Sequence, residues 1–224
     1  MRLVDGEPQP AQWHSVSIAE FAHRLVETAQ QSSTRLRGGG GPLLLAVNGR
    51  SASGKTTLAG GLAAELPGSV LVHTDDLCWH EPMFAWAHVQ RELISQIQQG
   101  GQVSFRPPQW ELRKRAGEIS IPADTEVVIF EGVGSSQSEV ADLLHASAWV
   151  QADFDVAEQR GIARDLLSGE NGNEEQTIAF WHAWIADERA HLRSDQPWGR
   201  ADLLVTAPPS PGSPDLNAVL WGQI

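Results

Sequence analysis

Cysteine is nearly absent from this chain, because Cys78 is the only one among 224 residues. A single cysteine excludes an internal disulfide and any metal site that needs several thiolates. Long apolar runs are missing as well, since no stretch reaches the roughly 18 apolar residues that predict a membrane-spanning helix. The N-terminus carries Asp5, Glu7 and two prolines, unlike a secretory signal peptide. These absences predict a cytoplasmic protein.

Basic residues are scarce relative to acidic ones. The chain has 16 lysines and arginines against 28 aspartates and glutamates, which gives a formal net charge of −12. Nucleic acids and anionic membranes bind basic surfaces, so we expect neither as a main partner. Tyrosine is absent, whereas tryptophan occurs nine times. Core packing is the default explanation for the tryptophans, although exposed ones would favour a homodimer.

The clearest motif is a phosphate-binding loop at residues 49–56, Gly-Arg-Ser-Ala-Ser-Gly-Lys-Thr, directly after an apolar run at 43–47. Its glycines allow a tight turn whose backbone N–H groups cradle phosphate oxygens. Lys55 brings positive charge to the β- and γ-phosphates, and the Thr56 hydroxyl can bind Mg²⁺. A helix that starts near Lys55 directs its positive end at the same anion. We therefore expect a nucleoside triphosphate to bind at Gly49, Ser51, Ala52, Ser53, Gly54, Lys55, Thr56 and Thr57.

Strand and helix patterns alternate along the chain. Short apolar runs predict strands at 43–47, 70–73, 126–130, 149–152 and 203–205, and helical spacing predicts helices at about 17–31, 55–66, 86–99, 155–167 and 174–192. Buried strands that alternate with helices are typical of a parallel sheet covered on both faces. The length suits one such domain. We divide the chain into an N-terminal arm, helix and connector at 1–42, a main domain at 43–210 with a lid near 156–175, and a C-terminal tail at 211–224.

Acidic residues follow two of the predicted strands, where ligands gather in parallel sheets. Asp75 lies about twenty residues after Lys55 and could accept the proton of a hydroxyl that attacks the γ-phosphate. The alternative for Asp75 and Asp76 is a helix cap or a solvated turn. Glu131 follows four apolar residues and could hold Mg²⁺ directly or through water. The alternative there is a structural strand-end carboxylate.

Arg160 and Arg164 are four residues apart, so they share one face of the helix predicted at 155–167. They precede a polar loop at 168–173. Arginines on such a lid can close over a triphosphate and neutralise charge that develops during phosphoryl transfer. The alternative is an exposed helix face with ordinary ion pairs. An Asn-Lys-x-Asp motif, which a switch GTPase needs to read guanine, is absent.

Taken in order, these motifs resemble the P-loop small-molecule kinases that are grouped with uridine kinase, phosphoribulokinase and pantothenate kinase. The resemblance rests on residues 49–56, 73–77 (His-Thr-Asp-Asp-Leu), 128–132 (Val-Ile-Phe-Glu-Gly), 155–165 and 200–205, and it covers about 43–206. It implies a P-loop NTPase fold, a three-layer α/β sandwich with a five-stranded parallel sheet. It also implies ATP and Mg²⁺ as cofactors, and transfer of the γ-phosphate of ATP to a hydroxyl of a small molecule such as a nucleoside or a sugar-like metabolite.

The resemblance also implies roles by position. Asp75 would be the general base, Thr56 and Glu131 would serve magnesium, and Lys55, Arg160 and Arg164 would contact phosphates. The loop at 206–208, with Pro208, would lie near adenine. Uridine kinases carry a Tyr-Asp-Phe-like segment between the second and third strands, where this chain has Pro108 and Gln109, and this departure counts against uridine.

We expect the acceptor pocket to come from residues 78–115. Tryptophan faces can stack on a ring, and an arginine could pair with an anionic group of the acceptor. The candidates are Trp79, His80, Trp86, Arg106, Gln109, Trp110 and Arg113. The sequence alone does not identify the acceptor or choose between Asp75 and Asp76 as the base.

Two other hypotheses stay open at this point. The chain could be a nucleotide-binding regulatory protein with little or no kinase activity, which would signal through a partner on the tryptophan-rich helix at 174–192. It could also be a former kinase that has lost its activity, because Pro108 and Gln109 replace the tyrosine and aspartate of the uridine kinase segment. ADP release that depends on an acceptor would separate a kinase from both.

Overall fold

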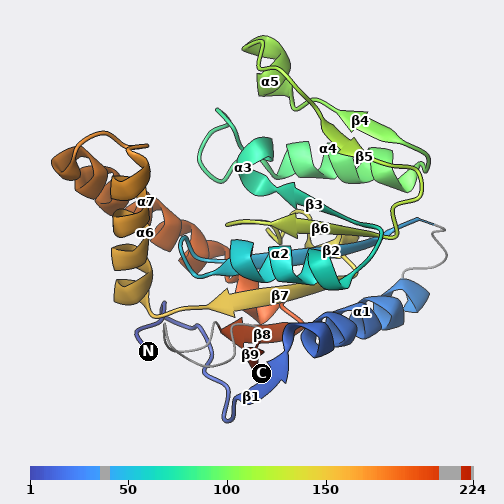
Figure 1. The fold of residues 1–224 in the computed structure, drawn as a ribbon, viewed down its shortest axis with the longest axis horizontal. Helices are drawn as coiled ribbons and strands as arrows, with labels where there is room; N and C mark the ends of the chain where they lie inside the picture. Colours follow the sequence, from blue (N-terminus) through green and yellow to red (C-terminus); the bar gives the residue numbers. More distant parts are fainter. Residues whose placement is uncertain (36–40, 207–217, 223–224) are drawn as a thin grey trace.

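The computed structural model describes residues 1–35, 41–206 and 218–222, and in it a twisted sheet lies between helices (Figure 1). The strands of this sheet are β1 (His14–Ser17), β2 (Leu43–Gly49), β3 (Ser69–His73), β6 (Val127–Glu131), β7 (Ala146–Gln151), β8 (Leu203–Thr206) and β9 (Ala218–Gly222). The helices are α1 (Ile18–Arg35), α2 (Lys55–Glu65), α3 (Thr74–Leu77), α4 (Ala87–Gln98), α5 (Pro108–Leu112), α6 (Phe154–Ser168) and α7 (Glu174–Asp195), with short 3₁₀ turns at Ala141–Leu143 and Pro197–Gly199.

The sheet has seven strands, so the expectation of five is corrected. Its order is β1-β9-β8-β7-β2-β6-β3. The five strands that were predicted from apolar runs form a continuous parallel set, β8-β7-β2-β6-β3. β9 adds to β8 in antiparallel register, and β1 pairs with β9. β1 lies at the edge of the sheet and has no apolar run, which is the signal that identified the other five strands. β9 lies between β1 and β8 and does carry an apolar run at 218–221, which the sequence analysis assigned to the C-terminal tail.

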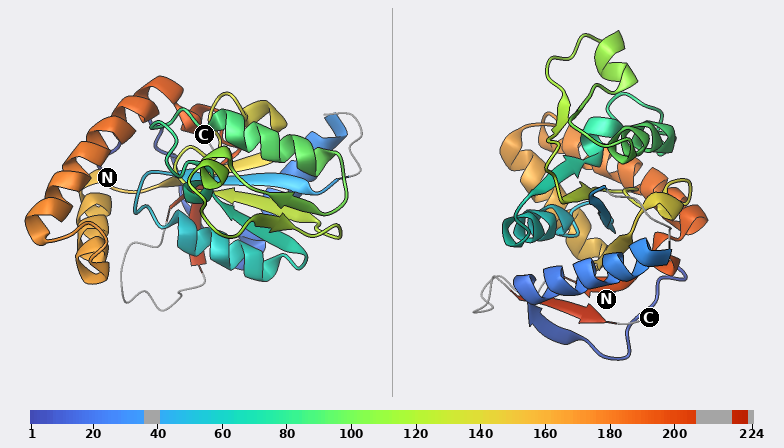
Figure 2. Two further views of the ribbon diagram at one scale, coloured as in Figure 1. Left: turned by 90° about the horizontal axis from the view of Figure 1, so that it is seen from above. Right: turned by 90° about the vertical axis from the view of Figure 1, so that its right-hand side faces the viewer.

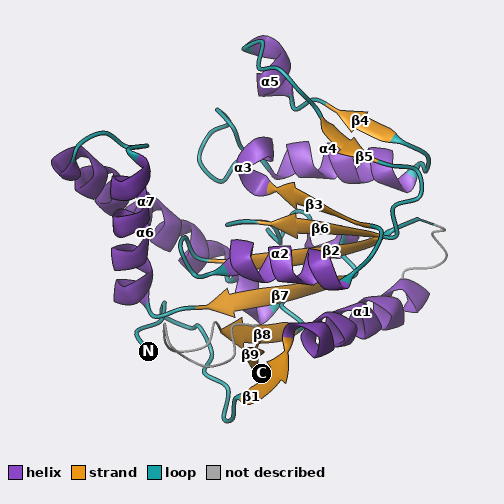
Figure 3. Cartoon of the chain, in the orientation of Figure 1, coloured by secondary structure: helices purple, strands orange, loops and turns teal. Residues whose placement is uncertain are grey.

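Both faces of the central strands are buried, which explains why their sequences are continuously apolar. On β2, Leu45 and Val47 pack in the cluster that includes α1 and α2, whereas Leu44 and Ala46 pack in the cluster that includes α4. Seen from above, α2 and α4 lie on opposite sides of the sheet (Figure 2, left). α6 and α7 lie at the end toward which the parallel strands point (Figure 3).

A small antiparallel pair, β4 (Val103–Phe105) with β5 (Ile119–Ile121), stands apart from the main sheet together with α5. Figure 1 shows it above α4. The sequence reading did not anticipate this pair, because each strand has only three residues. It carries part of the segment from which we expected the acceptor pocket. Among the described residues, no helix is both long and apolar enough to cross a membrane.

The N-terminal segment packs against the phosphate-binding loop through a buried ion pair. Glu7 accepts a hydrogen bond from Arg50 at 2.8 Å, and both side chains are almost completely buried. The other carboxylate oxygen of Glu7 accepts a hydrogen bond from the Trp149 indole at 2.7 Å. Because Arg50 follows the first glycine of the loop, this pair connects the start of the chain to the base of that loop.

Replacing Glu7 by alanine should lower the free energy of unfolding by about 3 kcal/mol, because it leaves the buried Arg50 guanidinium without its counter-charge. Urea unfolding followed by circular dichroism would measure the change. Arg2→Ala is the matched control, since it removes an ion pair with Asp155 in which both side chains are exposed, and it should cost under about 1 kcal/mol. Equal losses in the two variants would contradict the prediction.

Candidate active site

The phosphate-binding loop joins the end of β2 to the start of α2. Gly54, just before the helix, has a φ of 97°, a left-handed conformation that glycine adopts without strain. α2 then begins at Lys55, so its first backbone N–H groups have no partner within the helix and can bind an anion. The sequence prediction of a strand, a tight glycine turn and a helix over residues 43–66 is confirmed.

Lys55 is buried at the base of this turn, and its Nζ donates to the Arg50 carbonyl oxygen at 3.1 Å. Burial lowers the pKa of Lys55, and the negative charges of Glu131, Glu188 and Asp75 oppose that effect in decreasing order. Three carboxylates from three different elements therefore interact electrostatically with the ammonium group. A bound phosphate would add a further counter-charge for this desolvated cation.

Glu131 is the last residue of β6 and is only 4% exposed. Its Oε1 accepts a hydrogen bond from the Thr56 hydroxyl at 3.0 Å, and its Oε2 lies 2.8 Å from Nδ1 of His73. A hydroxyl and a carboxylate side by side at a phosphate-binding loop suit Mg²⁺, which takes few protein oxygens and completes its shell with phosphates and water. Within the described ranges, no group of three or more His, Cys, Asp or Glu side chains is arranged to hold a metal ion.

The register of the sheet places the ends of three strands side by side. Val47 pairs with Glu131, and Glu131 pairs with His73. A Cβ on Gly132 would lie 1.7 Å from Oγ1 of Thr74, so only glycine lets the chain after β6 approach the start of α3 this closely. Asp75, in the first turn of α3, is thereby held at the same edge of the sheet as the phosphate-binding loop.

The two neighbouring aspartates have different surroundings. Asp75 is exposed and lines the cavity in front of the phosphate-binding loop. The Asp76 carboxylate pairs with Arg115 at 2.7 Å, and its backbone carbonyl accepts a hydrogen bond from the Trp110 indole at 2.9 Å. Asp76 therefore belongs to the α5 side of the molecule, which favours Asp75 as the residue that could meet a substrate.

Arg160 and Arg164, on α6, both line this cavity. Arg160 donates to the Ala52 carbonyl at 3.2 Å, which ties α6 to the phosphate-binding loop. Arg164 donates to Asp165 at 2.8 Å, and its side chain is 63% exposed. The buried Asp165 carboxylate also accepts hydrogen bonds from Asn171 at 2.9 Å and from the Trp181 indole at 2.8 Å. Asp165 therefore connects α6, the loop at 169–173 and α7.

α7 contributes three residues, Phe180, Trp184 and Glu188, that the sequence analysis did not assign to the site. The Trp184 indole donates to Oγ of Ser51 at 2.7 Å, and the buried Glu188 carboxylate accepts a hydrogen bond from the Ser51 backbone N–H at 2.6 Å. Phe180 also lines the cavity. Phe180, Trp184 and Glu188 are spaced by four residues on one helix face, and this spacing was the available signal.

Many of these groups, although not Glu188, His73 or Asp76, line one cavity of about 470 Å³ on the edge of the sheet where the parallel strands end. The lining residues are Ser51, Ala52, Gly54, Lys55, Thr56, Thr57, Asp75, Glu131, Gly132, Val133, Arg160, Arg164, Asp165, Glu170, Asn171, Phe180, Trp181 and Trp184. Gly49 and Ser53 belong to the same loop but do not line the cavity. The predicted Pro208 lies outside the described residues.

The acceptor candidates from residues 78–115 all lie outside the lining of this cavity. The residues Trp79, His80, Trp86, Arg106, Gln109, Trp110 and Arg113 do not line this cavity. Trp86 and Trp110 are buried, and the Arg115 guanidinium stacks 3.7 Å from the centroid of the Trp110 ring. Arg106 donates to the carbonyls of Arg115 and Gly117. A contact between these candidates and an acceptor stays a prediction.

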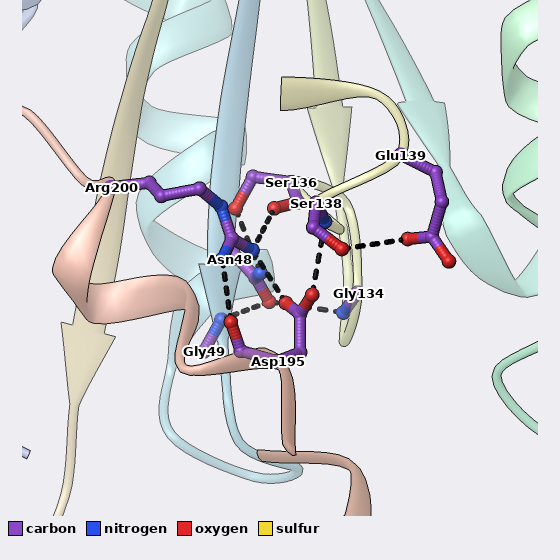
Figure 4. Close-up of polar contacts among 8 residues, drawn as sticks. All are labelled: Asn48, Gly49, Gly134, Ser136, Ser138, Glu139, Asp195 and Arg200. Carbon is purple, nitrogen blue, oxygen red and sulfur yellow. Dashed lines mark hydrogen bonds and ion pairs between the residues drawn. The ribbon is translucent and has the colours of Figure 1, made fainter. Parts of the chain in front are cut away.

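Behind the phosphate-binding loop, Asn48 organises a buried polar network (Figure 4). Its side-chain oxygen accepts hydrogen bonds from the backbone N–H groups of Gly49 at 2.8 Å and of Gly134 at 3.0 Å. Its amide nitrogen donates to Oγ of Ser136 at 2.9 Å. Arg200 continues the network by donating to the Ser136 carbonyl and to Asp195. The first glycine of the loop is thus fixed to the segment that follows β6.

Replacing Asn48 by alanine should lower the free energy of unfolding by about 2 kcal/mol, because two buried N–H groups lose their acceptor. Nucleotide affinity should fall as well, since Gly49 begins the phosphate-binding loop. Urea unfolding and a fluorescent-nucleotide titration would measure both. In the control Ser138→Ala, only an exposed hydroxyl bonded to Glu139 is lost, so both quantities should stay near wild type. An unchanged Asn48→Ala protein would show that the network does not position the loop.

No family profile and no curated protein matches this chain. Solved structures do. A protein provisionally named as a fructose transport system kinase, from Silicibacter sp. TM1040, superposes with a TM-score of 0.58 at 20% identity, covering 81% of this chain and 94% of that one. D-Glycerate 3-kinase from Cryptococcus neoformans var. grubii superposes with a TM-score of 0.52 at 12% identity, covering 82% and 87%.

A further match, a structure named as a possible uridine kinase from Bacillus stearothermophilus, has a TM-score of 0.46 at 17% identity and covers 81% of this chain and 98% of that one. That score is too low to carry an argument. At identities of 20% and 12%, the two better matches establish a shared fold and no more. The α/β fold of this chain is therefore that of P-loop kinases, as the motifs led us to expect.

Proposed function

We propose that this protein is an ATP-dependent kinase that phosphorylates a hydroxyl group of a small molecule. The observation that carries the proposal is the convergence of the phosphate-binding loop, Lys55, Asp75 and Glu131 on one cavity, with two arginines of α6. Each is a group that phosphoryl transfer uses, and four different elements supply them. The shared fold with two proteins named as kinases agrees with this reading.

Each residue has a role that follows from its place. The N–H groups at the start of α2 and the Lys55 ammonium hold phosphate oxygens, while Thr56 and Glu131 are the groups that would hold Mg²⁺. Bound ATP and Mg²⁺ would supply the transferable phosphoryl group and neutralise part of its charge. Asp75 accepts the proton of the acceptor hydroxyl. Arg160 and Arg164 stabilise negative charge on the side of the cavity formed by α6.

ADP release measured with and without an acceptor tests the proposal. We expect ATP to be consumed slowly by the enzyme alone and at least about 10²-fold faster once a suitable acceptor is added, because the acceptor hydroxyl is the group that Asp75 activates. Glu131→Gln should lower that rate and weaken its dependence on Mg²⁺ concentration. Tight ATP binding without any acceptor-dependent ADP release would contradict kinase activity and favour the regulatory alternative.

A further inference from the structure

Two aromatic side chains of α7 line the cavity that contains Asp75 and Glu131. This pair, the α7 wall, consists of Phe180 and Trp184, whose rings are inclined by only 22° with their centroids 6.3 Å apart. Phe180 is 44% exposed, although it is a large apolar residue next to charged groups. Trp181 also lines the cavity, but it is buried and its indole N–H is bonded to Asp165. The α7 wall therefore exposes apolar ring surface to the cavity, and the packing of α7 does not explain this exposure.

The α7 wall is fixed to the part of the molecule that presents Asp75. The Trp184 indole donates to Ser51, which is part of the phosphate-binding loop. On its other side it meets Phe84, with ring centroids 6.0 Å apart. Phe84 lies nine residues after Asp75, has a φ of +55° and stacks on His191 at 4.1 Å. A bulky residue rarely adopts that conformation, so packing must hold it there. These contacts connect the α7 wall to the phosphate-binding loop and to the segment that follows α3, and the wall lines the same cavity as Asp75.

The charges that line the cavity restrict the acceptor further. Three cations line it, Lys55, Arg160 and Arg164, and all three are groups that a triphosphate needs. Four carboxylates line it, from Asp75, Glu131, Asp165 and Glu170. Within the described part of the chain no other Lys or Arg lines this cavity. An acceptor with its own carboxylate or phosphate would therefore meet acidic groups and no spare cation.

We infer that the acceptor is an uncharged small molecule with a ring, which packs one face against Phe180 and Trp184 and presents a hydroxyl to Asp75. This inference rests on the proposed kinase function and narrows it. Nucleosides and ring-form sugars share this chemistry, because a nucleobase stacks on an aromatic side chain and the C–H face of a sugar packs on one. Anionic acyclic acceptors lack both features.

Acceptor-dependent ADP release with four pairs of probes tests the inference. The uncharged rings are uridine, adenosine, D-glucose and D-fructose. Their counterparts are orotidine and N6-succinyladenosine, which add carboxylates and keep every ribose hydroxyl, and the acyclic polyols glucitol and mannitol. D-Glycerate serves as an anionic acyclic probe. We expect stimulation from an uncharged ring and at least tenfold less kcat/KM from its counterpart. A nucleoside or a sugar as the best probe identifies which of the two sources fits.

The variant Phe180→Ala locates the ring. It should raise the KM of the best acceptor about tenfold, the effect of losing one stacked ring, while the KM of ATP changes less than twofold. His182→Ala is the matched control, because it removes an exposed ring from α7 that does not line the cavity. It should leave both KM values at wild type.

Three outcomes would count against the inference. If an anionic or acyclic probe gives the highest turnover, the inference is wrong but the kinase function is retained. The same conclusion follows if Phe180→Ala leaves the KM of the acceptor unchanged. A rise in the KM of ATP alone would mean that the α7 wall holds adenine, which also overturns it. No stimulation of wild-type ADP release by any probe, despite measured ATP binding, would refute the kinase function itself.

Discussion

Replacing Asp75 by asparagine is expected to lower acceptor-dependent turnover by about 10³-fold and to leave ATP binding intact. Asparagine keeps the size of the side chain but cannot accept the proton of the attacking hydroxyl. Asp75 is exposed on the first turn of α3, so the substitution should not disturb the core. The kcat from ADP release and the Kd from a fluorescent-nucleotide titration measure the two halves of the prediction.

Asp76→Asn is the matched control for this experiment. Asp76 has the same chemistry one residue away, but its carboxylate is held by Arg115 at 2.7 Å. Its loss should weaken the contact between α3 and α5 and reduce turnover far less than the loss of Asp75. If Asp75→Asn keeps near wild-type kcat while Asp76→Asn abolishes it, the assignment of the base is wrong.

Replacing Lys55 by methionine is expected to lower kcat/KM for ATP by about 10³-fold. Charge-assisted hydrogen bonds are worth about 1.5–3 kcal/mol each, and Lys55 can make more than one to a triphosphate. Its removal also leaves Glu131, Glu188 and Asp75 without the cation that offsets their repulsion of phosphate. Steady-state kinetics at varied ATP concentration would measure the loss.

The same variant should fold at least as stably as the wild type. Burial lowers the pKa of Lys55, which means that the folded state disfavours its charged form, and methionine fills similar space without that cost. Lys114→Met is the control, because Lys114 is the only other lysine and is exposed on the α5 side. If Lys55→Met retained wild-type kcat/KM for ATP in a folded protein, the phosphate-binding role of the loop would be refuted.

Much of the fold could be predicted because its signals are local. The five parallel strands each appear as an apolar run, because all but the edge strand β3 are buried on both faces, and Gly54 with Lys55 marks the turn into α2. β9 was missed although residues 218–221 are an apolar run, because they were assigned to the C-terminal tail. β1 was missed because it is a short edge strand with a mostly polar sequence, and its partners lie about two hundred positions away, as Ser15 and Leu220 do. Nothing local distinguishes such a segment from a loop.

The site was only partly predictable for the same reason. Asp75 and Glu131 follow strands directly, and parallel strands end at a common edge, so their meeting with the phosphate-binding loop could be expected. The contacts of Trp184 and Glu188 with Ser51 could not be predicted, because they join residues that are 133 and 137 positions apart. The aromatic candidates between 78 and 115 were chosen by the place of their segment in the chain and by residue type, and neither fixes which cavity a side chain lines.

The sequence by itself determined the phosphate-binding loop and the positions of the five parallel strands along the chain, since both depend on residues that are neighbours along the chain. Three features were decided by the tertiary structure alone. α7 supplies an aromatic wall to the cavity, and Glu7 neutralises Arg50. Asp76 forms an ion pair with Arg115, whereas Asp75 lines the cavity. Each of these depends on how two distant helices or loops pack against the sheet. That packing is set by the burial of the whole core, and no single segment encodes it.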